Sequence, residues 1–408
     1  MRSDPEYAPL HLRGSGEGVV TSCDIFCKVI DNYGDIGVCW RLARQLANEH
    51  GIAVRLWVDD LASFVKLCPE ADAALEKQEC GGVQVCLWHQ KFSVVQPAEL
   101  VIEAFACKLP QPYIAAMAEQ TRQPVWINLE YLSAEIWVES HHKLPSPHPT
   151  LPLTKYYFFP GYTAQTGGLL LEQDLLARRD AFQRDITQQQ TFWQSIGMEM
   201  PGEMPGAETL KISLFSYENA ALAGLLDVWA DSAQPILCLV PQGRIPSQIG
   251  LQVGQYFSDA APCAGKVYAR GMLQVRVLPF VEQQRYDEML WACDVNFVRG
   301  EDSWVRAQWA GKPFIWQVYP QYDSVHWKKL AAFVKVYSGQ LSPLARGAVQ
   351  NFYEAWNKGS GAGQAWPAFE ESLQELQQHG QRWARQQAEN NLALNLLDFS
   401  REIGRMRA

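Results

Sequence analysis

A short acidic loop near the start of the chain carries the first residues suited to catalysis. Two carboxylates, Asp31 and Asp35, flank the loop in the segment Asp31-Asn-Tyr-Gly-Asp-Ile-Gly37. The residues between them are Asn32, Tyr33 and Gly34. Such a pair beside a glycine suits a proton acceptor or an electrostatic clamp for a cation, and it would repel a phosphate. The alternative interpretation is that Asp35 only caps the following helix.

A second polar loop, Val298-Arg-Gly-Glu-Asp-Ser-Trp-Val305, suits an anion instead. It is predicted to join a strand to a helix, so the free N–H groups and the dipole of the helix start would attract a diphosphate. Arg299 adds a fixed positive charge and Ser303 adds a hydroxyl donor, whereas Glu301 can accept a hydrogen bond from a ribose or sugar hydroxyl. The alternative is an ordinary helix with Asp302 or Ser303 as its N-cap and Arg299 in a surface ion pair.

Aromatic residues at two other predicted strand ends can supply a flat apolar wall for a nucleobase. Phe215 and Tyr217 follow one strand, and Phe280 follows another. The nearby Gln283 has the amide donors and acceptor needed to read base edges. Each of these aromatic residues alone is also compatible with an ordinary core or loop position.

The elements that position these loops form two alternating series. A strand over 25–30, the acidic loop, a helix over about 36–50 ended by Gly51, and a strand over 53–58 make one βαβ unit, which implies a parallel sheet. Further strands are predicted at 83–88, 100–104 and 124–128. A second series has strands at 211–216, 235–240, 274–278, 294–298 and 314–318, with helices near 218–230, 283–292 and 302–310. The economical α/β architecture is two Rossmann-like domains facing a cleft, with ligands at the carboxyl ends of the strands.

The changes in composition along the chain predict five segments. A turn-rich and proline-rich stretch over 141–168, followed by a polar, glutamine-rich helix near 172–195, indicates a boundary between domains. The C-terminal stretch is helical, with an apolar face that we expect to dock back on the first domain. The predicted segments are a flexible extension (1–22), a first Rossmann-like domain (23–170), a linker helix and loop (171–207), a second Rossmann-like domain (208–365) and C-terminal helices (366–408).

The overall composition narrows the class of protein further. The 408 residues are 48% hydrophobic and 19% charged with a formal net charge of −9, which excludes a disordered chain and argues against a general nucleic-acid binder. No apolar run approaches the roughly 18 residues of a membrane helix, so we expect no membrane partner. Because of the acidic net charge, we also expect no direct nucleic-acid partner. Ten cysteines without a C-x-x-C pair predict buried free thiols in a reducing cytoplasm. The histidines of the 141–148 segment lack a metal-ligand pattern, and we expect no metal.

Three motifs together resemble one known family. They are Asp31-Asn-Tyr-Gly-Asp-Ile-Gly-Val-Cys-Trp-Arg-Leu-Ala-Arg-Gln-Leu46, Phe159-Pro-Gly-Tyr…Thr166-Gly-Gly-Leu169, and Arg299-Gly-Glu-Asp-Ser…Arg306-Ala-Gln-Trp-Ala-Gly-Lys-Pro313. The sequence resembles the bacterial protein-arginine rhamnosyltransferases that modify translation elongation factor P, over about residues 23 to 400. The resemblance implies a GT-B fold and transfer of L-rhamnose from dTDP-β-L-rhamnose to an arginine side chain with inversion. It also implies rescue of ribosomes stalled at polyproline, with no metal and no cofactor besides the donor.

The same resemblance assigns roles to individual residues. It implies Asp35 as the general base and Asp31 as an essential second acid. It implies donor contacts from Glu301, Asp302 and Ser303. Aromatic contacts to the thymine would come from the regions of Phe215, Tyr217 and Phe280.

The chemistry of arginine limits the mechanism that can follow. A guanidinium has a pKa above about 12, and complete proton transfer to an ordinary Asp before reaction would cost about 12 kcal/mol. The proton must therefore leave as the C–N bond forms, while a carboxylate pair holds the guanidinium and exposes one nitrogen. Arg299, Ser303 and backbone N–H groups would stabilise the departing dTDP.

Three other functions are compatible with parts of the pattern. An inverting GT-B glycosyltransferase acting on a small-molecule or cell-wall acceptor would share the donor site. A non-catalytic nucleotide-sugar sensor would bind the donor without needing two acids opposite it. A Rossmann oxidoreductase is disfavoured because the first βα turn lacks G-x-G-x-x-G and carries acids where a diphosphate would lie.

Overall fold

The computed structural model describes residues 20–29, 33–88, 95–198, 204–242, 248–259, 262–320 and 324–407. Two predicted site residues, Asp31 and Asn32, lie outside the described residues, as does most of the predicted extension 1–22. Within the described residues, no helix is long and apolar enough to cross a membrane. All ten cysteines are described and free, and nine of them are buried, with Cys263 the exposed one.

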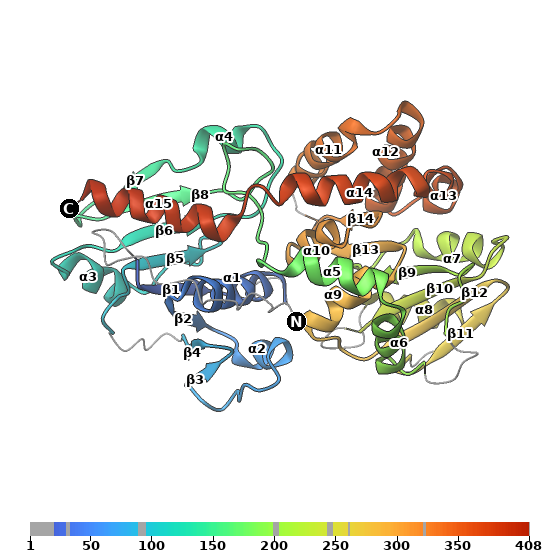
Figure 1. The fold of residues 1–408 in the computed structure, drawn as a ribbon, viewed down its shortest axis with the longest axis horizontal. Helices are drawn as coiled ribbons and strands as arrows, with labels where there is room; N and C mark the ends of the chain where they lie inside the picture. The colour runs from blue at the N-terminus through green and yellow to red at the C-terminus, as the bar shows by residue number, and fades with distance from the viewer. Residues whose placement is uncertain are drawn as a thin grey trace, which may run out of the picture.

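The described residues of the first half form an eight-stranded sheet in the order β3-β4-β2-β1-β5-β6-β8-β7 (Figure 1). Its six inner strands are parallel, and β3 and β7 pair antiparallel at the edges. The strands are β1 (Ser22–Cys27), β2 (Ala53–Val58), β3 (Lys77–Cys80), β4 (Val83–Leu87), β5 (Leu100–Ala104), β6 (Val125–Leu129), β7 (Pro145–Pro147) and β8 (Thr154–Phe158). The helices of this half are α1 (Gly34–His50), α2 (Leu61–Leu67), α3 (Gln111–Glu119) and α4 (Trp137–His141).

The described residues of the second half form a six-stranded sheet in the order β11-β12-β10-β9-β13-β14. Five strands are parallel and β11 is antiparallel at the edge. The strands are β9 (Leu210–Leu214), β10 (Ile236–Pro241), β11 (Val267–Arg270), β12 (Leu273–Leu278), β13 (Val295–Arg299) and β14 (Phe314–Gln317). The helices of this half are α7 (Leu222–Ala230), α8 (Gln248–Tyr256), α9 (Gln283–Ala292), α10 (Asp302–Ala310), α11 (Val325–Tyr337), the 3-10 helix η1 (Ser338–Gln340), α12 (Pro343–Lys358), α13 (Ala362–Glu371) and α14 (Leu373–Gln387).

Burial and hydrogen bonding explain where the first elements begin and end. The first strand is Ser22–Cys27 and not 25–30 as predicted, because its six residues pair in register with the six residues of β2. Helix α1 ends at Gly51 as predicted, with the glycine in the left-handed region at φ 67°. Its inner face is apolar and buried, including Ile36, Trp40 and Leu46.

Two segments differ from the pattern that the sequence suggests. The turn-rich stretch 141–168 contains β7 and β8, and β8 extends the first sheet by pairing with β6. The prolines of β7 disfavoured a strand prediction for this segment. They are tolerated because an edge strand leaves some N–H positions unpaired. The glutamine-rich segment forms two helices, α5 (Leu175–Arg184) and α6 (Ile186–Ser195), because the Asp185 carboxylate accepts the N–H of Thr187 at 2.8 Å and begins a new helix.

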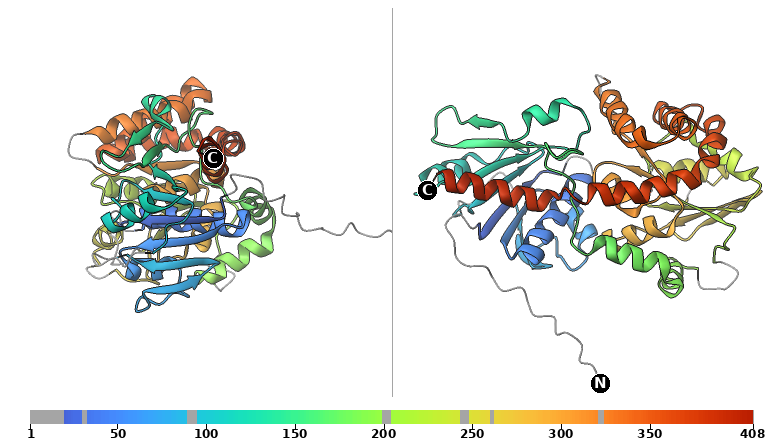
Figure 2. Two further views of the ribbon diagram at one scale, coloured as in Figure 1. Left: turned by 90° about the vertical axis from the view of Figure 1, so that its left-hand side faces the viewer. Right: turned by 45° about the horizontal axis from the view of Figure 1, so that its top comes forward.

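The C-terminal helices are shared between the halves. Helix α14 packs on α10 in the second half, whereas α15 (Leu392–Met406) runs along the first half (Figures 1 and 2). Its apolar face, with Leu396, Phe399 and Ile403, belongs to the core of the first half. The prediction that the C-terminal helix docks back on the first domain is confirmed.

Candidate active site

The two polar loops meet at the starts of α1 and α10. Each sheet changes the direction of its strand order at its first strand: β1 lies between β2 and β5, and β9 between β10 and β13. Doubly wound sheets bind ligands at the carboxyl ends of the strands at such a position. The acidic loop leads from β1 into α1, the second loop leads from β13 into α10, and α1 contacts α10. The fold therefore brings together the two loops that the sequence singled out.

Asp35 is the second residue of α1 and is 2% exposed. The N-cap position belongs to Tyr33, so Asp35 is not the cap of this helix. The Tyr131 hydroxyl donates a hydrogen bond to Asp35 Oδ1 at 3.1 Å, and the Tyr131 ring stacks on Phe105 at 4.3 Å between centroids. Burial, and then the charge of Asp35, raises the pKa of the Tyr131 phenol, so the phenol remains a protonated donor. This contact orients one oxygen of the buried Asp35 carboxylate.

Glu301 is the N-cap residue of α10 and connects the two halves. Its Oε2 accepts the backbone N–H of Leu132 at 3.0 Å. Burial raises the pKa of Glu301 to about 7, against the opposing charge of Lys329. Lys329 Nζ lies 5.6 Å from the centre of the Tyr131 ring, and burial lowers the pKa of this lysine. A carboxyl group with this pKa changes its protonation state near neutral pH.

A small pocket of about 80 Å³ lies between the start of α1 and the carboxyl ends of the second sheet. Eight of the residues predicted to bind substrate line it: Tyr33, Gly34, Phe215, Phe280, Gln283, Arg299, Asp302 and Ser303. Residues that the sequence did not single out also line it, among them Pro241, Gln242 and Tyr286. The pocket thus combines apolar rings with an arginine and a helix start, which suits a nucleobase joined to an anionic group.

The turn between β13 and α10 is held from both sides. The Ser303 hydroxyl donates to the carbonyl of Arg299 and accepts the Arg299 N–H at 3.2 Å. Gly300 takes a left-handed φ of 63°, which permits the sharp change from strand to helix. The Arg299 guanidinium lies 4.7 Å from the ring centre of Phe215 and 4.5 Å from that of Tyr217. Two aromatic rings therefore fix the direction of the positive charge at the pocket.

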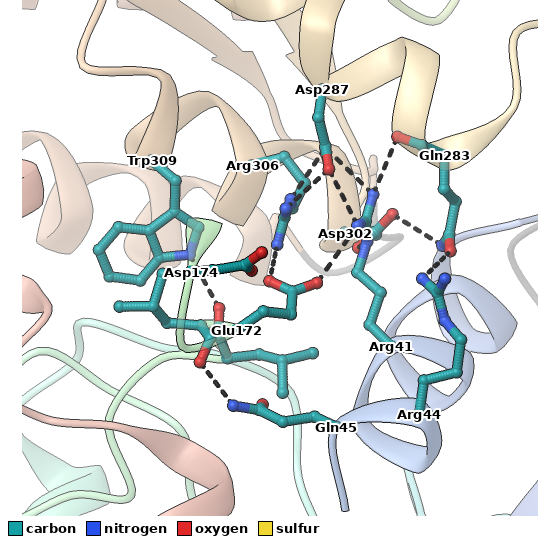
Figure 3. Close-up of polar contacts among 12 residues, drawn as sticks. Arg41, Arg44, Gln45, Glu172, Asp174, Gln283, Asp287, Asp302, Arg306 and Trp309 are labelled. Atoms are coloured by element: carbon teal, nitrogen blue, oxygen red, sulfur yellow. Dashed lines mark hydrogen bonds and ion pairs between the residues drawn. The ribbon is translucent and has the colours of Figure 1, made fainter. Parts of the chain in front are cut away.

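Asp302 and Gln283 make contacts between the two halves (Figure 3). Asp302 Oδ1 accepts from Arg41 Nε at 2.8 Å. Gln283 Nε2 donates to the carbonyl of Gly37 at 3.2 Å and is 3.4 Å from Asp302 Oδ2. Burial raises the pKa of Asp302, and Arg41 opposes that rise. These two residues line the pocket and also hold α1 against it.

Three of the described residues that were predicted for the site do not line this pocket: Asp35, Tyr217 and Glu301. Glu301 borders a neighbouring space with Arg41 and Leu132, and the Tyr217 ring contacts the Arg299 guanidinium. The backbone N–H of Tyr217 donates to Gln317 Oε1 at 2.9 Å.

Sequence reasoning missed three residues that the structure adds. Tyr131 comes two residues after β6. Because ligands bind at the carboxyl ends of parallel strands, this position alone could have marked Tyr131 as a candidate site residue. Arg41 lies inside a motif that we singled out, but a lone arginine within a helical pattern reads as surface. Lys329 belongs to a helix far along the chain, and nothing in its local sequence marks it.

Three potential metal-ligating side chains also lie together away from this site. The ligand atoms of Cys68, Glu70 and Cys80 are within 4.8 Å of one another. Burial raises the pKa of Cys68 to about 12, which disfavours the thiolate that a metal requires.

The two mainly parallel sheets, with a buried acid in the first half and a helix start at the pocket of the second, define a two-domain glycosyltransferase of the GT-B type. A glycosyltransferase from Rickettsia africae shares this fold, with a TM-score of 0.50, 7% identity and coverage of 95% of this chain and 98% of that one. Residues 23–401 match the family model described as elongation factor P (EF-P) rhamnosyltransferase EarP. The chain therefore belongs to the EarP family.

Individual relatives cover nearly the whole chain. A protein-arginine rhamnosyltransferase of Pseudomonas putida is 51% identical over 379 residues, which are 93% of this chain and 98% of the relative. The corresponding protein of Pseudomonas aeruginosa is 47% identical over 382 residues, 93% of this chain and 99% of the relative. A structure solved to explain EarP-mediated arginine glycosylation of EF-P has a TM-score of 0.66 and 38% identity, covering 93% of this chain and 99% of that chain. The sequence-based identification of the family is confirmed.

Proposed function

We propose that this protein transfers L-rhamnose from dTDP-β-L-rhamnose to an arginine side chain of EF-P, with inversion at the anomeric carbon. The observation that carries the proposal is the pairing of a buried carboxylate, Asp35, with a pocket built from aromatic rings, Arg299 and the start of α10. One side suits a guanidinium and the other suits a nucleoside diphosphate. Membership of the EarP family supports the choice of sugar and acceptor.

Asp35 acts as the general base in this proposal, with Asp31 as its partner toward the guanidinium. The acceptor arginine keeps its proton until its nitrogen attacks, because an ordinary carboxylate is far too weak a base to deprotonate it beforehand. The Tyr131 hydroxyl donates to Asp35 Oδ1 and so orients the carboxylate that receives the proton in this proposal. As the C–N bond forms, the proton passes to Asp35 and the bond from the anomeric carbon to the diphosphate breaks.

The leaving dTDP is stabilised from the second half. Arg299 supplies a full positive charge held between its ring contacts, and Ser303 keeps the turn closed so that the α10 N–H groups point toward the diphosphate. Phe215 and Phe280 form the walls for the thymine. These residues supply the positive charge, so the proposal includes no metal and no cofactor. A translation factor as acceptor places the reaction in the cytoplasm and links it to relief of polyproline stalling.

Intact-mass measurement tests the proposal directly. The purified chain is incubated with dTDP-rhamnose and EF-P, beside an EF-P variant whose acceptor arginine is replaced by lysine. We expect EF-P to gain one deoxyhexosyl group and the lysine variant to gain none. If EF-P stays unmodified while a small-molecule or cell-wall acceptor is glycosylated, the acceptor assignment is wrong; if dTDP-rhamnose binds and nothing is glycosylated, the protein is a sensor.

A further inference from the structure

We infer that Arg41 is a positioning residue, which sets the helix that carries Asp35 against the donor-binding loop by acting through Asp302. The inference rests on the proposed function, because it concerns the alignment of the proposed base with the proposed donor. Arg41 lies on α1 and is 2% exposed. It is six residues beyond Asp35 on the same helix, about 9 Å along the axis.

Among the described residues, the hydrogen-bond partners of the Arg41 side chain belong to other parts of the molecule. Its Nε donates to Asp302 Oδ1 at 2.8 Å, and its two terminal nitrogens contact the two oxygens of Asp287 at 3.1 and 3.2 Å. It also reaches the carbonyl of Gln283 at 3.4 Å and Glu172 Oε1 at 3.5 Å. Among the described residues, every one of these acceptors lies in the second half or in the linker. One side chain of the first half therefore uses its whole donor set across the domain boundary.

Arg306 completes this buried cluster from the second half (Figure 3). It contacts Asp287 at 2.7 Å and Glu172 at 2.6 Å, so each of these two carboxylates is held by both arginines. Burial alone would raise the pKa of Glu172, but Arg306 and Arg41 outweigh it and lower that pKa to about 2. Glu172 is therefore held ionised, and removing Arg41 breaks the direct ion pair of Asp302 while Arg306 still contacts Asp287 and Glu172.

Close packing between α1 and the start of α10 links the position of the Arg41 cluster to the proposed site. A Cβ atom on Gly37 would come within 3.2 Å of both Asp302 Oδ2 and Gln283 Nε2. Gly37 is two residues after Asp35, and Asp302 stands between Glu301 and Ser303. The Arg41–Asp302 pair therefore fixes the distance between the base and the residues at the donor pocket.

Steady-state kinetics and donor binding of Arg41→Lys test this role, because lysine keeps the charge and loses the planar fork. We expect the donor Kd, measured by calorimetry with dTDP, to stay within about 3-fold, while kcat falls about 10- to 100-fold, as misplacement by about 1 Å can cause. Asp302→Asn, which keeps Arg41 intact, is the second variant and is expected to lower kcat in the same way. The double variant should be close to the more affected single variant, because both changes remove one contact.

Arg55→Lys is the matched control. Arg55 makes a similar ion pair with the buried Asp24, at 2.6 Å, at the end of the first sheet opposite to the acidic loop. The kcat of Arg55→Lys should therefore be unchanged. Normal kcat in Arg41→Lys overturns the inference, and so does loss of dTDP binding in parallel with kcat. If the unmodified protein does not glycosylate EF-P, the proposed function is wrong, and the role of Arg41 is then tested by X-ray scattering. A larger radius of gyration for Arg41→Lys but not for Arg55→Lys supports the inference. Equal radii of gyration for the two variants overturn it.

Discussion

At the scale of single residues, the site is built from acids in unlike surroundings. Asp35 is buried and receives a hydroxyl hydrogen bond from Tyr131. Glu301 receives a backbone N–H, but burial raises its pKa to about 7. Carboxyl groups held in unlike surroundings are a common arrangement in acid–base sites.

Replacing Asp35 with Asn tests the proposed base. We expect kcat to fall by about 10²- to 10⁴-fold, the usual contribution of a general base, while dTDP binds normally. The asparagine oxygen can still accept from Tyr131, so the protein should stay folded. Tyr131→Phe removes only the orienting hydroxyl and should reduce kcat by a smaller factor. If Asp35→Asn transferred the sugar at the normal rate, Asp35 would only stabilise the start of α1 and would not be the base.

Replacing Glu301 with Gln tests its raised pKa through stability. The folded-state pKa of about 7 exceeds the ordinary value of 4.5, so the protonated form is the one that folding favours. Its contribution is fully present below about pH 4.5 and is lost as pH rises through 7. Glu301→Gln mimics the protonated form and should stabilise the protein by about 2–3 kcal/mol more at pH 8 than at pH 5. Urea unfolding at both pH values measures this, with the exposed Glu371→Gln as control; equal effects at both pH values would mean that the pKa is normal.

At the scale of elements, the turn from β13 into α10 decides how the helix start is presented. Strand β13 is the neighbour of β9 at the switch point, and Gly300 allows the chain to turn at once into α10. Ser303 ties the first turn of the helix back to Arg299. Local hydrogen bonds therefore tie the strand end to the helix start, and Arg299, Gly300, Asp302 and Ser303 line the pocket.

Gly300→Ala should disturb this turn. Its left-handed φ of 63° costs a residue with a Cβ roughly 1–2 kcal/mol, and relief of this strain would turn the α10 N–H groups away from the pocket. We expect weaker dTDP binding by calorimetry, by about 10-fold. Gly359→Ala imposes a similar strain at φ 74°, where α12 ends, and should lower stability without changing dTDP binding. Equal dTDP affinity in both variants would remove the turn from the donor site.

At the scale of the whole molecule, the chain crosses between the halves twice and the crossings are joined. Leu169 N–H donates to the Asn390 carbonyl at 3.0 Å, and Leu392 N–H donates to the Leu169 carbonyl at 2.9 Å. The second crossing delivers α15 to the first half, where its apolar face completes the core. The pocket of about 80 Å³ is smaller than the roughly 300–1,000 Å³ of most ligand sites.

Leu396→Ala tests how much α15 contributes to the first half. Leu396 is fully buried in the first core, and its truncation should cost about 2–5 kcal/mol. Leu394 on the same helix is 47% exposed, so Leu394→Ala should change stability by less than about 0.5 kcal/mol. Thermal or urea unfolding compares the two variants. Similar stabilities would mean that α15 docks only weakly on the first half.

The sequence by itself determined the two alternating series, the helix end at Gly51 and the family, because local periodicity and contiguous motifs contain that information. It also singled out the acidic loop and the 299–303 loop, since both follow strands. Only the tertiary structure decided that Tyr131 holds Asp35, that Arg41 contacts Asp302 from 261 residues away, and that a proline-bearing hairpin extends the first sheet. These features depend on pairings between distant segments, and local sequence preference does not specify which buried charge meets which partner.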